Sequence, residues 1–280
     1  MSDQRLTKKQ HYVPRMYLKR WLCENDKKLL VITKKAQNNN VQAVSVDNEL
    51  FYQDYCYDIP NPDGTLWTSN EVEKAFGKYE KRHNKLLDRI LNRCEEDVPI
   101  FDKGTNRIED FLEFVALMVV RNPNNNIPFN FDDIQFSTTE LNDLFQETFG
   151  NKWSITGLQV VANSMKKRLL FDTAKQVNQT DNLPEVYFLR STDGSYFITS
   201  DNPVLCSEKW SYIPLSPRYA AFILYDTRIN CRFKQNRVFQ LSSEEAQKFN
   251  SLYWRQDDTY TIIGNRESDL IDSLDIEVKG

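Results

Sequence analysis

The chain has 280 residues, of which 40% are hydrophobic, 27% charged and 12% aromatic, and its formal net charge at pH 7 is −4. This composition excludes an intrinsically disordered chain, because it supplies enough apolar and aromatic surface for a core. The negative net charge excludes a general electrostatic attraction to nucleic acid or anionic membranes and leaves only a local basic cleft open.

The cysteines and the N-terminal residues indicate a cytoplasmic protein. The five cysteines are odd in number and include no Cys-x-x-Cys pair, which favours reduced thiols over a disulfide framework. The first residues are polar and lack the apolar core of a signal peptide. The longest apolar run, 111–120, is too short to span a bilayer, so we expect no membrane partner.

The first predicted helix begins at Pro14, because proline is tolerated at the first helical position. Its buried face is predicted to contain Tyr17, Leu18, Trp21 and Leu22. The free N–H groups and partial positive charge of a first turn, with His11 and Arg15 beside it, can hold a phosphate. In the structural alternative, His11 only caps this helix or packs against its first turn.

Short strands and a long helix follow. Strands are predicted over 29–33 and 41–46, and an extended aromatic segment over 50–57. Thr68 or Asn70 then begins a helix, since each has a glutamate three residues later, the spacing of a capping box. One stripe of this helix is predicted to be buried: Val72, Phe76, Tyr79, His83, Leu86, Ile90 and Leu91. Its histidine is therefore interpreted as a packing residue at the edge of the core.

The apolar segment 111–120 predicts a central buried helix, capped by Asn106 with Glu109 three residues on. The helix ends at Arg121-Asn122-Pro123. Arg121 has a complete structural explanation there, since a cation suits the negative end of a helix dipole. In the functional alternative, the helix holds the guanidinium in a cleft, where it binds an anion through two parallel hydrogen bonds.

Two more helices are predicted, at 137–145 and 158–172. The basic run Lys166-Lys167-Arg168 is interpreted as a solvated face of the second of these, rather than as a nucleic-acid patch.

From residue 184 the pattern changes to β. Strands over 186–190 and 196–199 are predicted to form a hairpin around Asp193-Gly194. Ser242, with a glutamate three residues later, begins a late helix. Further strands are predicted at four places: 210–215, 220–225, 237–241 and 259–263.

Together these elements predict an α+β fold in one domain, in which a central helical bundle packs against a mainly antiparallel β-sheet formed by N-terminal and C-terminal segments. Within it we expect an N-terminal part at 10–66, a helical part at 68–175 and a β-rich part with one helix at 184–264. An acidic, partly helical tail follows at 265–280.

Most familiar catalytic motifs are absent. The chain has only eight glycines, and neither a phosphate-binding loop nor a dinucleotide-binding glycine motif. It also lacks the Gly-x-Ser-x-Gly elbow and the kinase signature. Two histidines without paired cysteines predict no metal ligands, although a magnesium site made of carboxylates stays open. Which cofactor the protein uses, if any, is unknown from the sequence.

The turn Thr199-Ser200-Asp201-Asn202-Pro203 follows a predicted strand, which is a common place for functional residues. Asp201 and Asn202 favour turns because their side chains bond the local backbone, and this is the structural alternative. In the functional reading, Asp201 orients a histidine or binds a metal, and Asn202 donates a hydrogen bond to an oxyanion.

The chain resembles a microbial domain-of-unknown-function family marked by an N-terminal His-Tyr-Val-Pro motif. Three stretches carry the resemblance: Gln10–Trp21, Phe197–Val204 with its Thr-Ser-Asp-Asn-Pro motif, and Pro214–Pro217. Arg121 and Asn250 also resemble family positions. The resemblance spans 10–263 and implies an architecture and candidate residues, but no activity. The constellation that it favours has four members: His11, Arg121, Asp201 and Asn202.

Two functions from different classes stay open. The first is a hydrolase, a metal-independent nuclease or phosphodiesterase that binds a nucleotide or nucleic acid in a local cleft. His11 would act as general acid or base, Asp201 would orient it, and Arg121 would stabilise developing charge. The predicted substrate-binding residues are Arg15, Tyr12, Ser200, Asn202 and Asn250.

The second is a non-catalytic ligand-binding or accessory module, of the kind used in microbial defence or toxin systems. In this reading the same polar residues join the N-terminal segment to the β-rich part. Whether the protein is an enzyme therefore stays open at this point, and the sequence indicates no oligomeric state.

Overall fold

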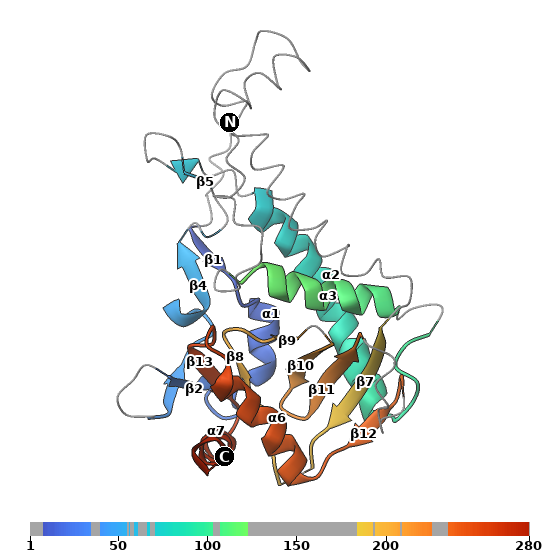
Figure 1. Cartoon of the computed structure of the whole chain (residues 1–280). Coiled ribbons are helices and arrows are strands. Elements are labelled where there is room, and N and C mark those ends of the chain that lie inside the picture. The colour runs from blue at the N-terminus through green and yellow to red at the C-terminus, as the bar shows by residue number, and fades with distance from the viewer. Residues whose placement is uncertain are drawn as a thin grey trace.

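The structure is a computed structural model that describes residues 8–34, 40–54, 56, 59–60, 66–67, 71–102, 107–122, 184–192, 194–207, 209–225 and 235–279. It has a mixed α+β fold (Figure 1). Several predicted features lie outside the described residues: the helices at 137–145 and 158–172, the basic run 166–168, and the capping residues Thr68, Asn70 and Asn106.

The larger of the two main sheets has five strands in the order β12-β7-β11-β10-β9. Their bounds are β7 Glu185–Arg190, β9 Leu205–Cys206, β10 Trp210–Ser216, β11 Tyr219–Leu224 and β12 Val238–Gln240. The β12–β7 pair is parallel and the others are antiparallel. The predicted strands of the β-rich part therefore form one sheet, except the segments around 199 and 261.

The second main sheet joins the N-terminal and C-terminal segments, as predicted. The expected single sheet is nevertheless divided in two, because the described strands of the five-stranded sheet include no N-terminal strand. The second sheet has four antiparallel strands in the order β3-β2-β13-β8. Their bounds are β2 Leu29–Thr33, β3 Gln42–Val44, β8 Thr199–Ser200 and β13 Thr261–Gly264. Among the described residues there are also two small ribbons: β1 Lys9–His11 with β4 Tyr52–Asp54, and β5 Ile59–Pro60 with β6 Leu66–Trp67.

The described helices are α1 Arg15–Leu18, α2 Glu71–Glu95, α3 Ile108–Val120, α6 Ser243–Arg255 and α7 Glu267–Lys279, with 3-10 turns at Lys19–Trp21 and Glu49–Phe51. The capping box of α6 forms as predicted, because Ser242 and Glu245 bond each other's backbone N–H. At α3 the N-cap position is occupied by Arg107, without a side-chain cap. None of the described helices is long and apolar enough to cross a membrane.

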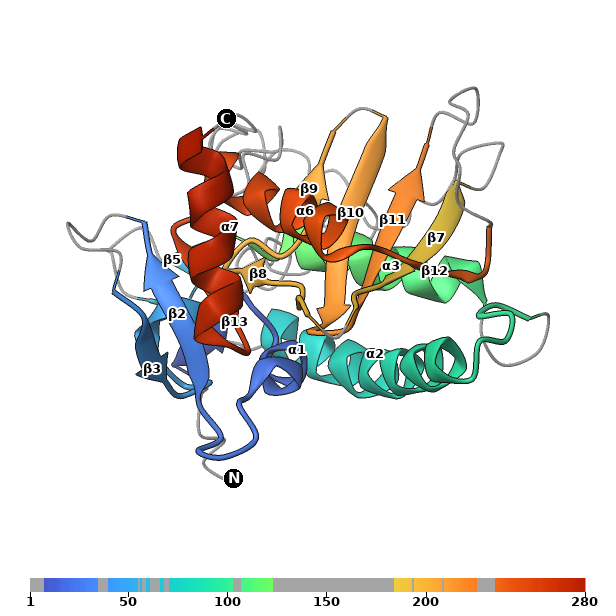
Figure 2. The same cartoon turned by 90° about the horizontal axis from the view of Figure 1, so that it is seen from below.

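Helices cover both faces of the five-stranded sheet (Figure 2). Neighbouring residues of a strand point to opposite faces of the sheet, so Tyr187 and Phe188 of β7 lie on opposite faces. Phe222 of β11 is paired with Tyr187 and therefore also lies on the face opposite Phe188. On one face the ring of Phe111 in α3 lies 5.8 Å from that of Phe188. On the other, Phe249 in α6 stacks on Tyr212 at 4.8 Å. The sheet is therefore the middle layer of the core.

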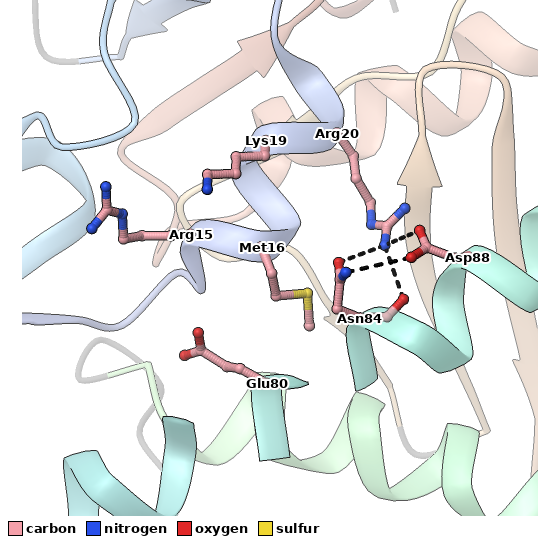
Figure 3. A pocket seen from close by; sticks show the side chains of 7 residues that line it. All are labelled: Arg15, Met16, Lys19, Arg20, Glu80, Asn84 and Asp88. Carbon is pink, nitrogen blue, oxygen red and sulfur yellow. Dashed lines mark hydrogen bonds and ion pairs between the residues drawn. The ribbon is translucent and has the colours of Figure 1, made fainter. Parts of the chain in front are cut away.

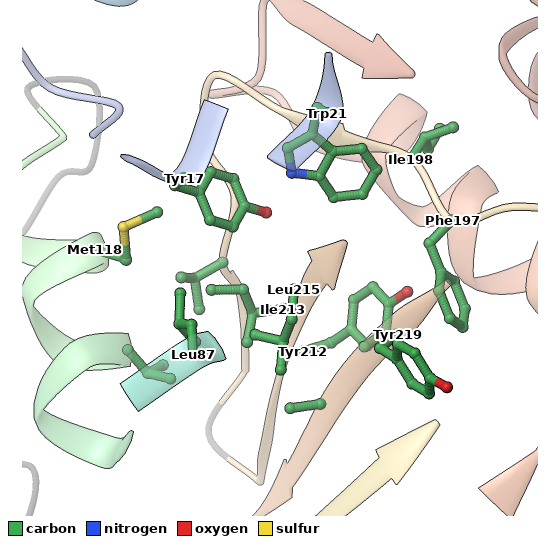
Figure 4. Close-up of a cluster of buried hydrophobic side chains, with 14 of the residues drawn as sticks. Tyr17, Trp21, Leu87, Met118, Phe197, Ile198, Tyr212, Ile213, Leu215 and Tyr219 are labelled. Carbon is green, nitrogen blue, oxygen red and sulfur yellow. The ribbon is translucent and has the colours of Figure 1, made fainter. Parts of the chain in front are cut away.

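Tyr17 of α1 and Trp21 of the following 3-10 turn belong to a cluster of buried side chains that also contains Ile213 and Leu215 of β10 (Figure 4). Tyr17 and Trp21 are fully buried. The Tyr17 hydroxyl lies 2.7 Å from Thr199 Oγ1 of β8 and donates to the Pro214 carbonyl of β10 at 2.7 Å. One side chain of the N-terminal segment thus contacts a strand of each sheet.

The first helix, predicted to begin at Pro14 and to end at Glu24-Asn25-Asp26, is shorter in the structure. Pro14 is the N-cap rather than the first helical residue, and only four α-helical residues follow before a 3-10 turn. Leu22 is extended, since the chain must turn through Cys23–Lys28 to begin β2. A helix this short has little macrodipole, so the predicted phosphate site at its N-terminus is not supported.

The predicted hairpin around Asp193-Gly194 is wrong. β7 pairs with β11 and β12, whereas β8 pairs with β13 in the other sheet. The backbone between them is bonded elsewhere: Asn250 in α6 accepts from Ile198 N–H at 3.0 Å and donates to the Tyr196 carbonyl at 2.8 Å. These side-chain bonds replace the ladder that a hairpin would form.

Candidate functional site

The imidazole of His11 lies beside Asp47, a residue that the sequence pattern does not single out. His11 ends β1, and its Nε2 is 3.3 Å from the Val46 carbonyl oxygen and 3.7 Å from Asp47 Oδ1. Burial lowers the pKa of His11 below its ordinary 6.5, and the cations of Arg15 and Arg121 lower it further. The imidazole is therefore neutral at pH 7 and can accept a proton.

Asp47 also binds Arg15, which begins α1. The Arg15 guanidinium donates to Asp47 Oδ2 at 3.0 Å, and both side chains are about half exposed, at 51% and 54%. One carboxylate therefore lies between an imidazole and a guanidinium at the surface. Since 36 positions separate His11 from Asp47 and no spacing rule links them, their meeting depends on the β1–β4 pairing and the turn at residues 45–48.

Arg121 is buried between three elements rather than open to a ligand cleft. Its side chain is 3% exposed, and Nη1 lies 3.0 Å from Glu80 Oε1 in α2. Nη2 donates to the backbone carbonyl of His11, and the guanidinium lies over the Phe76 ring at 4.5 Å. The structure thus brings Arg121 and His11 together, but through the backbone of His11.

The Ser200-Asp201-Asn202 turn is almost fully buried and bonded within the protein. The Tyr260 N–H donates to Asp201 Oδ1 at 3.1 Å, and the Asn202 amide donates to Asp258 Oδ2 at 2.9 Å. Ser200 Oγ accepts from the Asn202 N–H at 3.0 Å and donates to the Asn202 carbonyl at 2.6 Å. Burial raises the pKa of Asp201 to about 6, although N–H groups of Thr261 and Tyr260 oppose this. These contacts fit the structural alternative.

Tyr12 and Asn250 also bond the backbone. The half-buried Tyr12 hydroxyl donates to the Leu50 carbonyl at 2.5 Å. Asn250 is fully buried, and both atoms of its amide hold the 196–198 segment. We therefore place Asn250, with the buried Ser200 and Asn202, in the architecture instead of in a substrate-binding surface.

An open groove of about 510 Å³ lies between α1 and α2 (Figure 3), and is called the α1/α2 groove below. Its lining residues are Arg15, Met16, Lys19, Arg20, Glu80, Asn84 and Asp88. Three cationic and two anionic side chains give it a formal charge of +1 in a chain whose net charge is −4. Of the predicted site residues, only Arg15 lines it. Lys19 and Arg20 also line it, but they belong to no sequence motif that predicts a binding site.

A small crevice of about 10 Å³ lies next to the groove and shares Met16 and Glu80 with it. Arg121 and His83 line this crevice, which has room for about one water molecule. His83 is 3% exposed, and burial lowers its pKa to about 3, as expected for a neutral packing residue. Within the described ranges, no group of three or more histidine, cysteine or acidic residues is placed to hold a metal ion.

Comparison with known proteins identifies a family. The family model of DUF4238, described as a protein of unknown function, matches residues 9–268. No curated protein and no solved structure matches the chain. The match confirms a domain-of-unknown-function family, as the resemblance implied, whereas the assignment of its individual motifs stays a prediction.

Proposed function

Because the chain belongs to the DUF4238 family of proteins of unknown function, we propose its function from this site: the α1/α2 groove binds a phosphate-containing ligand such as a nucleotide. The observation that carries the proposal is Lys19. Its side chain is exposed on the groove, and among the described residues no hydrogen bond or ion pair involves its ammonium group. Within the part of the chain that the structure describes, its charge is therefore not neutralised by a carboxylate.

Arg15, which lies on the same side of the groove as Lys19, supports an anion next to it. Its guanidinium is held by Asp47 at 3.0 Å. Fixed side chains lose less conformational entropy when a ligand arrives, so they bind at lower cost. The groove volume of about 510 Å³ lies in the usual range of small-ligand sites.

Binding is expected to depend on Lys19. We expect pyrophosphate and ATP to bind the wild-type protein in calorimetric titrations at low salt, and Lys19→Glu to weaken both at least about tenfold, or 1.4 kcal/mol. The matched control is Lys209→Glu, an exposed lysine in the turn between β9 and β10 that does not line the groove. Equal losses in both variants, or no binding by the wild type, would contradict the proposal.

A second candidate function is hydrolysis of the bound phosphate ester. It is favoured by the pairing of His11 with Asp47, because a neutral imidazole beside a carboxylate and an arginine suits general acid–base catalysis. In this reading Asp47 takes the orienting role that was predicted for Asp201. The non-catalytic module stays the alternative, with the same groove and no turnover.

His11→Gln separates these two functions. If the protein is a phosphodiesterase, the variant should lose about 100-fold or more in kcat while pyrophosphate binding changes little. Since the pKa of His11 lies below 6.5, the wild-type rate should be constant from pH 7 to 8 and fall as the imidazole gains a proton at lower pH. Binding without turnover of nucleotides or phosphodiesters in the wild type would favour the module.

A further inference from the structure

We infer that the ligand of the α1/α2 groove is a ribonucleotide whose sugar hydroxyls bind Asp88. This inference rests on the proposed phosphate site. It concerns the other end of the groove, where the cation Arg20 is already bonded to the carboxylate of Asp88 and the amide of Asn84.

The groove has two chemically different ends (Figure 3). Arg15 and Lys19 extend on one side of it, and Arg20, Asn84 and Asp88 lie together on the other side, with Met16 between them. A ligand that fills the groove therefore needs an anionic end and a neutral, hydrogen-bonding end. Inorganic phosphates have only the first.

Asp88 is held in place by a largely buried cation. Arg20 Nη2 donates to Asp88 Oδ1 at 2.8 Å, to Asn84 Oδ1 at 2.8 Å and to the Asn84 carbonyl at 3.2 Å. The Arg20 side chain is 13% exposed, whereas that of Asp88 is 53% exposed. A carboxylate oxygen has more than one lone-pair position, so Asp88 can accept further hydrogen bonds on its open side.

Hydroxyl groups are the ligand groups that suit this end. A carboxylate repels phosphate but accepts two hydrogen bonds from neighbouring hydroxyls, which is how acidic residues bind ribose in nucleotide sites. Met16 supplies a polarisable apolar surface on which the sugar or base can pack. A ribonucleotide supplies all three parts: a phosphate for the cationic side, a sugar ring that packs on Met16, and sugar hydroxyls that reach Asp88.

The structural alternative is that the Arg20–Asn84–Asp88 contacts only fix α1 on α2. The two roles predict effects of opposite sign on inorganic pyrophosphate. If Asp88 binds sugar hydroxyls, Asp88→Asn removes a negative charge from the groove and leaves pyrophosphate affinity unchanged or higher. If Asp88 only holds α1, the variant displaces Arg15 and Lys19 and lowers that affinity.

The test is a set of titrations with pyrophosphate, the four ribonucleoside triphosphates and their 2′-deoxy counterparts. We expect at least one ribonucleotide to bind the wild type about tenfold tighter than its 2′-deoxy counterpart, because the deoxy sugar leaves an acceptor of Asp88 unused. Asp88→Asn should bring this ratio close to one. The control is Asp54→Asn, which should keep the ratio. Asp54 is an exposed aspartate of β4 that pairs with Lys8.

Equal affinity for every ribo and deoxy pair in the wild type would overturn the inference, as would parallel losses of pyrophosphate and ribonucleotide in Asp88→Asn. Both results leave the phosphate site standing if pyrophosphate binds the wild type. If pyrophosphate and all nucleotides fail to bind the wild type, the proposed function itself fails.

Discussion

Replacing Arg121 by methionine is expected to lower the free energy of unfolding by about 3 kcal/mol, one of the two largest effects we predict. The guanidinium is 3% exposed and joins α3 to Glu80 of α2 and to the backbone of β1. Methionine keeps apolar contact with Phe76, but leaves the His11 carbonyl and the Glu80 carboxylate without this donor. Because Glu80 is 27% exposed and can regain water, we expect the lower end of the range for broken buried pairs.

Urea unfolding of the variant and two controls measures this effect. Arg107→Met removes an exposed arginine that pairs with Asp110 at 3.3 Å, and should cost less than about 0.5 kcal/mol. The double variant Arg121→Met/Glu80→Gln should recover about 1 kcal/mol, since it removes the unpaired carboxylate. A loss below about 1 kcal/mol for Arg121→Met, together with weaker pyrophosphate binding, would instead assign Arg121 to ligand binding.

Asp201→Asn is expected to gain free energy of unfolding relative to the wild type as pH rises from about 4 to about 6, by about 3 kcal/mol in total. Burial raises the pKa of Asp201 from 3.8 to about 6, a difference of about two pKa units at 1.36 kcal/mol each. Between these pH values the folded state holds a proton that the unfolded state has lost, so stability falls as pH rises from about 4 to about 6. Asparagine cannot ionise, and its side-chain oxygen can still accept from the Tyr260 N–H.

The measurement is the unfolding free energy of both proteins from pH 4 to pH 7.5. The variant should gain on the wild type steadily up to about pH 6 and then keep a constant advantage. His11 and His83 have lowered pKa values and act in the opposite direction, but both proteins share them, so their effects cancel in the difference. A difference that does not vary with pH would show that Asp201 is ionised in the folded state across this range.

Local signals in the sequence predict several elements correctly. The stripe of α2 is buried at Phe76, His83, Leu86 and Ile90. Ser242 caps α6, and Trp210–Ser216 pairs with Tyr219–Leu224 as neighbouring strands. In each case the deciding interactions lie within a helix face, a helix end or two adjacent strands, so a short stretch of sequence contains them.

Elements that depend on distant partners could not be predicted in this way. The Asp193-Gly194 hairpin is wrong because Asn250, more than fifty positions later, bonds the backbone that a second strand would have used. The first helix is short because the chain must turn back into β2. At both places tertiary contacts override a local preference.

The residues of the candidate site also divide into those that local sequence singles out and those that only the three-dimensional structure identifies. His11, Arg15 and Arg121 stand out in the sequence through their rarity or their place at a helix end. Asp47 and Lys19 do not, because an ordinary surface aspartate or lysine gains meaning only from its neighbours in space. The sequence therefore identifies some candidate residues, and the structure shows which polar residues lie together on an open surface.

The most direct test of the phosphate site is a crystal structure of the protein soaked in tungstate, an electron-dense phosphate mimic, with and without competing pyrophosphate. We expect an anomalous peak in the α1/α2 groove in contact with the Lys19 ammonium and the Arg15 guanidinium, which pyrophosphate removes. An empty groove under conditions where pyrophosphate binds in solution, with the anion bound elsewhere on the protein, would contradict the assignment.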